Sequence, residues 1–213
     1  DKYIYYLNPA QAREEDEDAK EVSTDEQVTT RDLGQGLWLM TVPSFFSDDI
    51  NDQLRNAMKR IGNNKPKGLI IDLRGNTGGF MDAGVVLAGL IISPGELIDT
   101  RIRNNTSIKD IASGQQAWVK NVAIRVLVDG ATASASEIAA AALQSQGVKL
   151  IGEKTRGKAR VQDAYDLSGG GRLVMTTERW LTPSGIDIQD KGLIPDIKTE
   201  TKDALKKAIE DLS

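Results

Sequence analysis

The hydrophobic pattern after Gly36 predicts strands and helices in alternation. Apolar runs at 37–42, 68–73 and 122–128 predict strands, and the continuous run GLIIDL at 68–73 is typical of a strand that is covered on both faces. Apolar residues at helical spacing predict helices at 48–61, 82–92, 137–146 and 201–212. Shorter strands are predicted at 97–102 and 148–151. Strands that alternate with helices predict an α/β fold with a layered core.

Two further strands are predicted outside this alternation. Segments 161–167 and 172–177 flank a run of three glycines, which predicts a β-hairpin added to the core. The last residues, 199–213, form an amphipathic pattern that predicts a C-terminal helix. We therefore expect a core over 36–198 followed by that helix.

The first 35 residues follow a different pattern. Residues 1–33 carry ten acids and four bases, whereas the remaining 180 residues carry 21 acids and 23 bases, so the net charge is −6 in the first part and +2 in the second. Almost no apolar residue occurs from Arg13 to Glu26, which is typical of a solvated linker or arm. The apolar residues of 3–7 are expected to dock as a strand. We predict an acidic, partly flexible segment over 1–35.

The composition excludes several kinds of site. The chain has no Cys and no His, which excludes disulfides, thiolate nucleophiles, Ser-His-Asp triads and metal sites built from thiolate or imidazole. The net charge of −4 disfavours nucleic-acid binding. The sequence has no apolar run of about 18 residues, so we predict no membrane span. A serine hydrolase built from this chain would need another base, for which lysine is the leading candidate.

A glycine pair follows the buried strand in the motif DLRGNTGG at 72–79. Gly78 and Gly79 lack Cβ, so their N–H groups can approach a ligand closely and stabilise an oxyanion. The alternative is a plain turn from strand to helix, with or without a bound anion.

A serine lies where the strand at 122–128 leads into the Ala-rich helix, in the motif DGATASASEI at 129–138. At Ser134 the helix dipole favours negative charge, and the N–H of Ala135 has no partner within the helix. A nucleophile beside an oxyanion donor needs this arrangement. The alternative is a capping box formed by Ser134 and Glu137. Two other hydroxyls compete for the nucleophile's role, those of Thr132 and Ser136.

A lysine lies in a glycine-containing turn in the motif GEKTRGKARVQ at 152–162. As a general base, Lys158 would have to be neutral near pH 7, and lowering its pKa by about three units from the ordinary 10.4 costs roughly 4 kcal/mol. Burial in an apolar cleft can supply that shift. Gln162 lies four residues on, on the same face of an extended segment, and could orient the lysine nitrogen. The alternative is a surface lysine, as we expect for Lys154 and Lys149.

Together these motifs resemble the C-terminal processing (tail-specific) peptidases, a family of serine peptidases with a Ser/Lys dyad. The resemblance runs from Gly36 to Ile197 and is carried by GLIIDLRGNTGG, VLVDGATASASEIAAAALQ, GEKTRGKARVQ and LTPSGIDIQDKGLIPDI. It implies a core of the tail-specific protease type with crotonase-like βαβ units. It also implies the roles of the site residues, which are the nucleophile Ser134, the base Lys158, the supporting Gln162, and oxyanion donors at Ala135 and one of Gly78 and Gly79.

The resemblance further implies a serine endopeptidase that cleaves proteins or peptides near an accessible C-terminus through an acyl-enzyme, without a metal or cofactor. It implies a location outside the cytoplasm, in a periplasm or an organelle lumen. Two other hypotheses remain open. The chain could be a resting or inactive core that binds apolar peptide or lipid ligands, or a crotonase-like acyl-CoA enzyme that also uses paired backbone amides.

Two departures from the family pattern affect these expectations. Family members usually carry a PDZ domain ahead of the core, and nothing in 1–35 resembles one. Arg156 and Ala159 stand where Phe and Gly are common. Arg156 would place a positive charge near Lys158, where it would favour the neutral amine or bind a substrate carboxylate.

Overall fold

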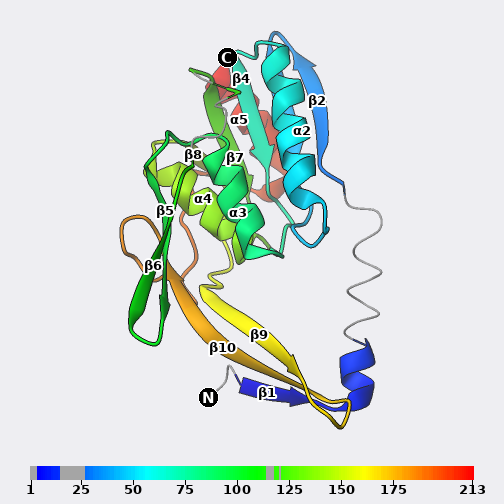
Figure 1. The fold of residues 1–213 in the computed structure, drawn as a ribbon. Coiled ribbons are helices and arrows are strands. Elements are labelled where there is room, and N and C mark those ends of the chain that lie inside the picture. Colours follow the sequence, from blue (N-terminus) through cyan, green and yellow to red (C-terminus); the bar gives the residue numbers. More distant parts are fainter. Residues whose placement is uncertain (1–3, 15–26, 114–117, 120) are drawn as a thin grey trace.

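The computed structural model describes residues 4–14, 27–113, 118–119 and 121–213. Within them the chain forms two sheets, a central sheet with helices on both faces and a second sheet from which a long hairpin projects (Figure 1). The predicted α/β class is confirmed.

The central sheet has six strands in a mostly parallel arrangement. Its order is β11 (Ile197–Lys198), β8 (Lys149–Gly152), β7 (Ala123–Val128), β4 (Gly68–Asp72), β3 (Leu37–Thr41) and β2 (Thr29–Gly34). Only the β2–β3 pair among these neighbours is antiparallel. Every residue of β4 is buried, as the unbroken apolar run predicts for a strand covered on both faces.

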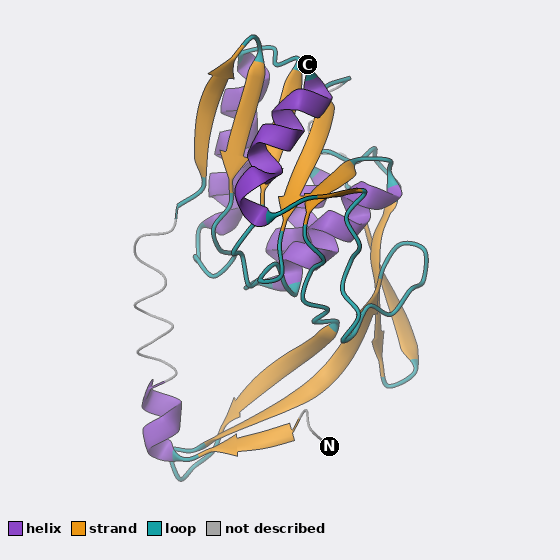
Figure 2. Ribbon diagram, turned by 180° about the vertical axis from the view of Figure 1, so that it is seen from behind, coloured by secondary structure: helices purple, strands orange, loops and turns teal. Residues whose placement is uncertain are grey.

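Helices cover the central sheet unequally. One face packs against α2 (Ile50–Asn63), α3 (Met81–Gly89) and α4 (Ala135–Ser145), and the other packs against α5 (Ala204–Leu212), which follows the short 3-10 helix η1 (Thr201–Asp203). Figure 2 shows α5 in front of the sheet and the other helices behind it. Because strand side chains alternate between faces, Leu69 and Ile71 join the larger core while Ile70 packs toward α5.

The second sheet carries the hairpin that the sequence predicts. Strand β10 (Arg172–Leu181) pairs with β9 (Arg160–Asp166) along most of its length, with β1 (Ile4–Leu7) along its first residues and with β5 (Leu97–Arg103) at its end. Strand β6 (Thr106–Ile111) completes the sheet beside β5. In both views β1, β9 and β10 project away from the core (Figures 1 and 2).

Two strands lie where the sequence predicts none. Residues 29–34, within the predicted acidic segment 1–35, form the edge strand β2, and Thr106–Ile111 form β6. Both segments are mostly exposed, so they have no apolar pattern, and backbone pairing with β3 and β5 defines them instead. Residues 15–26, most of the predicted linker, lie outside the described residues.

One carboxyl in the second sheet is buried without a compensating partner. Asp99 on β5 is fully buried, and neither of its side-chain oxygens has a hydrogen-bond partner in the described part of the chain. Its cross-strand neighbour is Asp110, which pairs with Arg101 at 2.8 Å. Burial, with Asp110 adding to it, raises the pKa of Asp99 to about 8. Asp99 is therefore mainly protonated at neutral pH.

We expect Asp99 to make the protein less stable as the pH rises from about 4 to about 8. Over this range the unfolded chain loses the proton that the folded chain keeps, so the free energy of unfolding falls by about 1.4 kcal/mol per pH unit. Urea unfolding at pH 5, 6.5 and 8 measures this slope. Asp99→Asn should flatten it, whereas the exposed control Asp52→Asn should leave it unchanged. Equal slopes in the wild type and Asp99→Asn would contradict the prediction.

Candidate active site

Ser134 has a strained backbone at the start of α4. Its φ of 57° and ψ of −121° lie in a region that residues with a side chain rarely adopt, at a cost of about 1–3 kcal/mol. The preceding loop is held by the Asp129 carboxylate, which accepts the N–H groups of Gly75, Ala131 and Thr132. The surrounding structure therefore enforces a conformation that presents the half-buried Ser134 at the helix mouth.

The carboxylate of Glu137 links Ser134 to the lysine-containing turn. Glu137 is fully buried, and its Oε2 accepts the N–H groups of Ser134 at 3.0 Å and Lys158 at 2.8 Å. Its Oε1 accepts the Gly157 N–H at 2.7 Å and the Thr155 hydroxyl at 2.5 Å. Hydrogen bonds to a charged acceptor are the stronger kind, and together they offset the desolvation of a buried charge.

The sequence indicated only one of these four contacts. The spacing of Ser134 and Glu137 predicts a capping box, and the hydrogen bond from the Ser134 N–H to Glu137 is the half of that box that involves the glutamate. The further signal was the position of Glu137, an acid among alanines on a helix that is buried along most of its length. A charged residue there requires partners from elsewhere in the chain.

The glycine pair lies directly against Ser134. A Cβ on Gly78 would lie 2.8 Å from the Ser134 Cβ and 3.3 Å from the Ala135 nitrogen, so only glycine fits without a shift. Gly78 also has a φ of 106°, which glycine adopts without strain. The structure thus brings together Ser134, Ala135 and Gly78, as the sequence predicts.

Asn76 connects the two loops, and sequence reasoning missed it. Its fully buried side chain donates to the Val42 carbonyl and accepts the Gly78 N–H, each at 2.9 Å. Its backbone carbonyl accepts the Ala133 N–H at 3.0 Å. One residue therefore positions both the glycine pair and the residue before Ser134.

The backbone N–H groups at the site differ in whether they already donate a hydrogen bond within the protein. The Gly78 N–H is bound to Asn76, whereas no acceptor is found in the described residues for the N–H of Gly79 or of Ala135. Gly79 forms an isolated parallel bridge with Phe45, whose own N–H and carbonyl bond to Gly78 and Phe80. In such a bridge the N–H of Gly79 points away from Phe45, so it is the available donor of the pair.

Lys158 is placed differently from the expectation of a shielded amine. Its backbone is bound to Glu137, but its side chain is exposed, and within the described part of the chain no hydrogen bond joins it to Ser134. The reason is local: 154–159 alternates between exposed and buried positions, and Thr155, Gly157 and Ala159 take the buried ones. Gln162 follows on β9, half-buried and opposite Thr176.

The segment 181–197 contacts the residues that directly follow Lys158. The Gln189 side chain accepts the Ala159 N–H at 2.8 Å, and Asp187 pairs with Arg160 at 3.0 Å. Although partial burial acts in the opposite direction, the bonds from Arg160 and the Gln189 backbone N–H hold the pKa of Asp187 below its usual value. These contacts hold the segment against the turn that carries Lys158.

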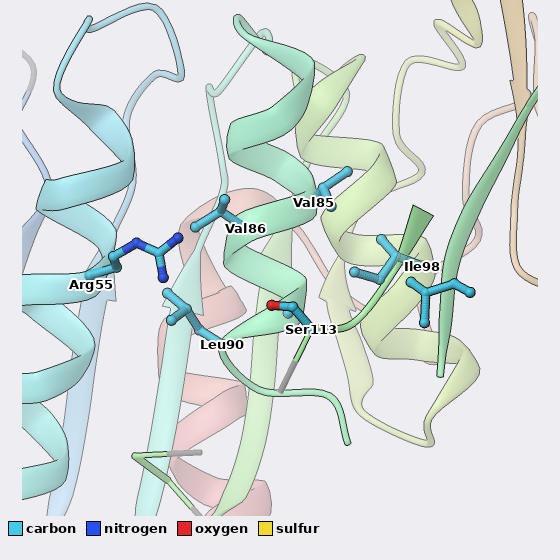
Figure 3. A pocket seen from close by; sticks show the side chains of 8 residues that line it. Arg55, Val85, Val86, Leu90, Ile98 and Ser113 are labelled. Atoms are coloured by element: carbon cyan, nitrogen blue, oxygen red, sulfur yellow. The ribbon is translucent and has the colours of Figure 1, made fainter. Parts of the chain in front are cut away.

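A small cavity lies apart from these residues (Figure 3). It is lined by mainly apolar side chains on or directly after α3, β5 and β6, including Val86, Leu90 and Ile98, together with Arg55 of α2 and Ser113. None of the predicted site residues lines it. In the described ranges, no group of acidic side chains could hold a metal ion, and no helix is long and apolar enough to cross a membrane.

Comparison with known proteins shows that the chain is similar to peptidases. The model of peptidase family S41 matches residues 38–199. The carboxy-terminal processing protease CtpA of Bacillus subtilis is 36% identical over 162 residues, which are 76% of this chain and 34% of that protein. The carboxyl-terminal-processing protease of Synechocystis sp. is 36% identical over 154 residues, 72% of this chain and 36% of that protein. The chain spans about a third of the length of these relatives.

Solved structures share the fold. A photosystem II D1 C-terminal processing protease superposes with a TM-score of 0.71 and 25% identity, covering 93% of this chain and 48% of that one. A lipoprotein from Streptococcus agalactiae has a TM-score of 0.73 and 23% identity, covering 98% of this chain and 75% of that one. The second likeness concerns the fold alone.

We expect Glu137→Gln to release the lysine turn from α4. In glutamine an NH2 group replaces one of the two accepting oxygens, so some of the four donors lose their acceptor. Each buried donor left without an acceptor lowers the free energy of unfolding by about 1–3 kcal/mol. Amide hydrogen exchange should be slow at Ser134, Gly157 and Lys158 in the wild type and faster in the variant. The exposed control Glu96→Gln should not alter it. Unchanged exchange at these amides in Glu137→Gln would show that Glu137 does not hold the turn.

Proposed function

The chain belongs to peptidase family S41, and we propose from this that it is a serine endopeptidase with Ser134 as nucleophile and Lys158 as general base. The observation that carries the proposal is the strained Ser134 at the mouth of α4, in contact with Gly78 and one residue from the unused N–H of Ala135. A strained turn that presents a hydroxyl beside free amides suits attack on a carbonyl.

The proposed reaction proceeds in two halves. Neutral Lys158 takes the proton of the Ser134 hydroxyl while Oγ bonds to the peptide carbonyl carbon. The N–H groups of Ala135 and Gly79 stabilise the oxyanion, the C–N bond breaks, and Lys158 returns the proton to the leaving amine. Water then attacks the acyl-enzyme with its proton passing to Lys158, and Ser134 recovers a proton as the acid product leaves.

To act as the base, Lys158 must be shielded from water, but its side chain is exposed in the structure. Exclusion of water from an amine favours its neutral form. We propose that the bound peptide covers Lys158 and that the Gln162 amide orients its nitrogen. Glu137 keeps the lysine backbone in place meanwhile.

The surroundings of the glycine pair suit an apolar substrate. Phe46 and Phe80 flank the bridge between Phe45 and Gly79, and their side chains are 47% and 44% exposed. Exposed aromatic rings beside an oxyanion site favour apolar side chains near the bond that is cleaved. From the family we propose protein or peptide substrates cut near an accessible C-terminus, and action outside the cytoplasm.

A second candidate function rests on the exposure of Lys158. If the lysine stays hydrated and charged throughout, the chain binds apolar peptides or lipids without cleaving them. A fluorophosphonate probe distinguishes the two: labelling of Ser134 supports the peptidase, whereas binding of an apolar peptide without labelling supports the binding module.

We expect Ser134→Ala and Lys158→Ala each to lower kcat by about 10³-fold or more, because both remove groups that act in the chemical step. Cleavage of a quenched fluorescent apolar peptide measures kcat and KM.

Matched controls for these variants are Ser168→Ala in the hairpin turn and Lys206→Ala on α5, both of which should leave cleavage unchanged. Circular dichroism checks that all four variants are folded. Full activity in a folded Ser134→Ala protein would refute the assignment of the nucleophile.

A further inference from the structure

Three positive side chains are exposed in the segment that leads to Lys158. Lys154, Arg156 and Lys158, here called the cationic row, are exposed, while Thr155 and Gly157 between them are buried. Gly157 has a φ of 83°, so the chain turns between Arg156 and Lys158. The row therefore exposes three charges within five residues of chain.

The backbone of the row is held firmly. The Arg156 N–H donates to the Thr132 carbonyl at 3.0 Å, in the loop that carries Ser134. Gly157 and Lys158 are bound to Glu137 on α4. The backbone of Arg156 is thus fixed against the loop that carries the candidate nucleophile.

No carboxylate pairs with a side chain of the row within the described residues. Arg160, the next cation, pairs with Asp187, but none of the three side chains of the row has an ion pair or hydrogen bond there. Acids close to the row are engaged with other groups: Glu153 accepts from Thr201, Asp190 accepts from Gln189, and Glu137 accepts from backbone N–H groups of the row. Three cations without a side-chain partner attract anions to this part of the surface.

We propose that Arg156, assisted by Lys154, binds a carboxylate of the peptide substrate a short way along the chain from the scissile bond. The inference rests on the proposed peptidase function and adds its specificity. A guanidinium binds a carboxylate through two parallel hydrogen bonds, which makes Arg156 the main contact and Lys154 the weaker one.

The spacing of the row limits the expected distance. A fully extended chain would advance about 3.3 Å per residue, so Arg156 lies at most roughly 7 Å and Lys154 at most roughly 13 Å from Lys158. A carboxylate bound there belongs to a residue within about four positions of the scissile bond. It is supplied either by the free C-terminus of the substrate or by an acidic side chain.

Binding is tested on the Ser134→Ala protein with a fluorescein-labelled apolar peptide. The free-acid peptide should bind about tenfold more tightly than its C-terminal amide, by fluorescence anisotropy. Arg156→Gln should remove this difference, Arg156→Lys should keep part of it, and Lys206→Gln, an equal change of charge on α5, should leave it intact. Added salt should weaken only the free-acid peptide. Amide-capped peptides with Glu or Gln at the second position then test whether a side-chain carboxylate serves equally well.

Cleavage by the active protein tests the spacing. Peptides with one to eight residues beyond a fixed cleavage site should show the highest kcat/KM at about four residues or fewer, through a lower KM, and Arg156→Gln should flatten that profile. Equal binding of acid and amide peptides, with no effect of Arg156→Gln, would overturn the inference. Carboxylate-dependent binding without any cleavage would instead refute the peptidase function and retain the row as a binding site.

Discussion

The buried carboxylate of Glu137 is the interaction on which the candidate site depends. A charge with no exposed surface is tolerated only when its oxygens are fully used, and Glu137 uses both on donors from two separate segments. Ser134 comes from the start of α4, and Lys158 comes from the turn that leads into β9. Their backbones are held together because leaving the carboxylate without either partner is unfavourable.

The central sheet supplies the second constraint. Strands β4 and β7 are parallel neighbours, so their carboxyl ends meet at one edge, and from there one leads to the glycine pair and the other to Ser134. Crevices at such edges are the usual ligand sites of α/β sheets. Asn76 joins the two loops across this edge, and the strain at Ser134 persists because the packing on all sides determines its backbone.

The lysine side of the site is less constrained. Glu137 fixes the backbone of Lys158 but leaves its side chain in solvent, in the segment between β8 and β9. The surroundings of Ser134, the proposed nucleophile, are thus held by hydrogen bonds, whereas the side chain of Lys158, the proposed base, has none within the described residues. This division agrees with a site that excludes water only when a peptide is bound.

Local patterns in the sequence were enough for much of this protein. Buried strands such as β4 and helices such as α2 follow from apolar spacing, because burial of one face or both is recorded in neighbouring residues. The motifs around Gly78, Ser134 and Lys158 also identified the family, since long motifs in a fixed order carry that information without a structure.

Only the tertiary structure decided how distant segments meet. The polar strands β2 and β6 exist through backbone pairing with β3 and β5, which no periodicity records. The partners of Glu137 lie up to 21 residues away, so its role as a link was not visible in a capping motif. The exposure of Lys158 was decided in the same way, because Ala159 and Thr155 take the buried positions against the fold. Contacts between segments set these features, and a linear pattern records only what a residue's own neighbours require.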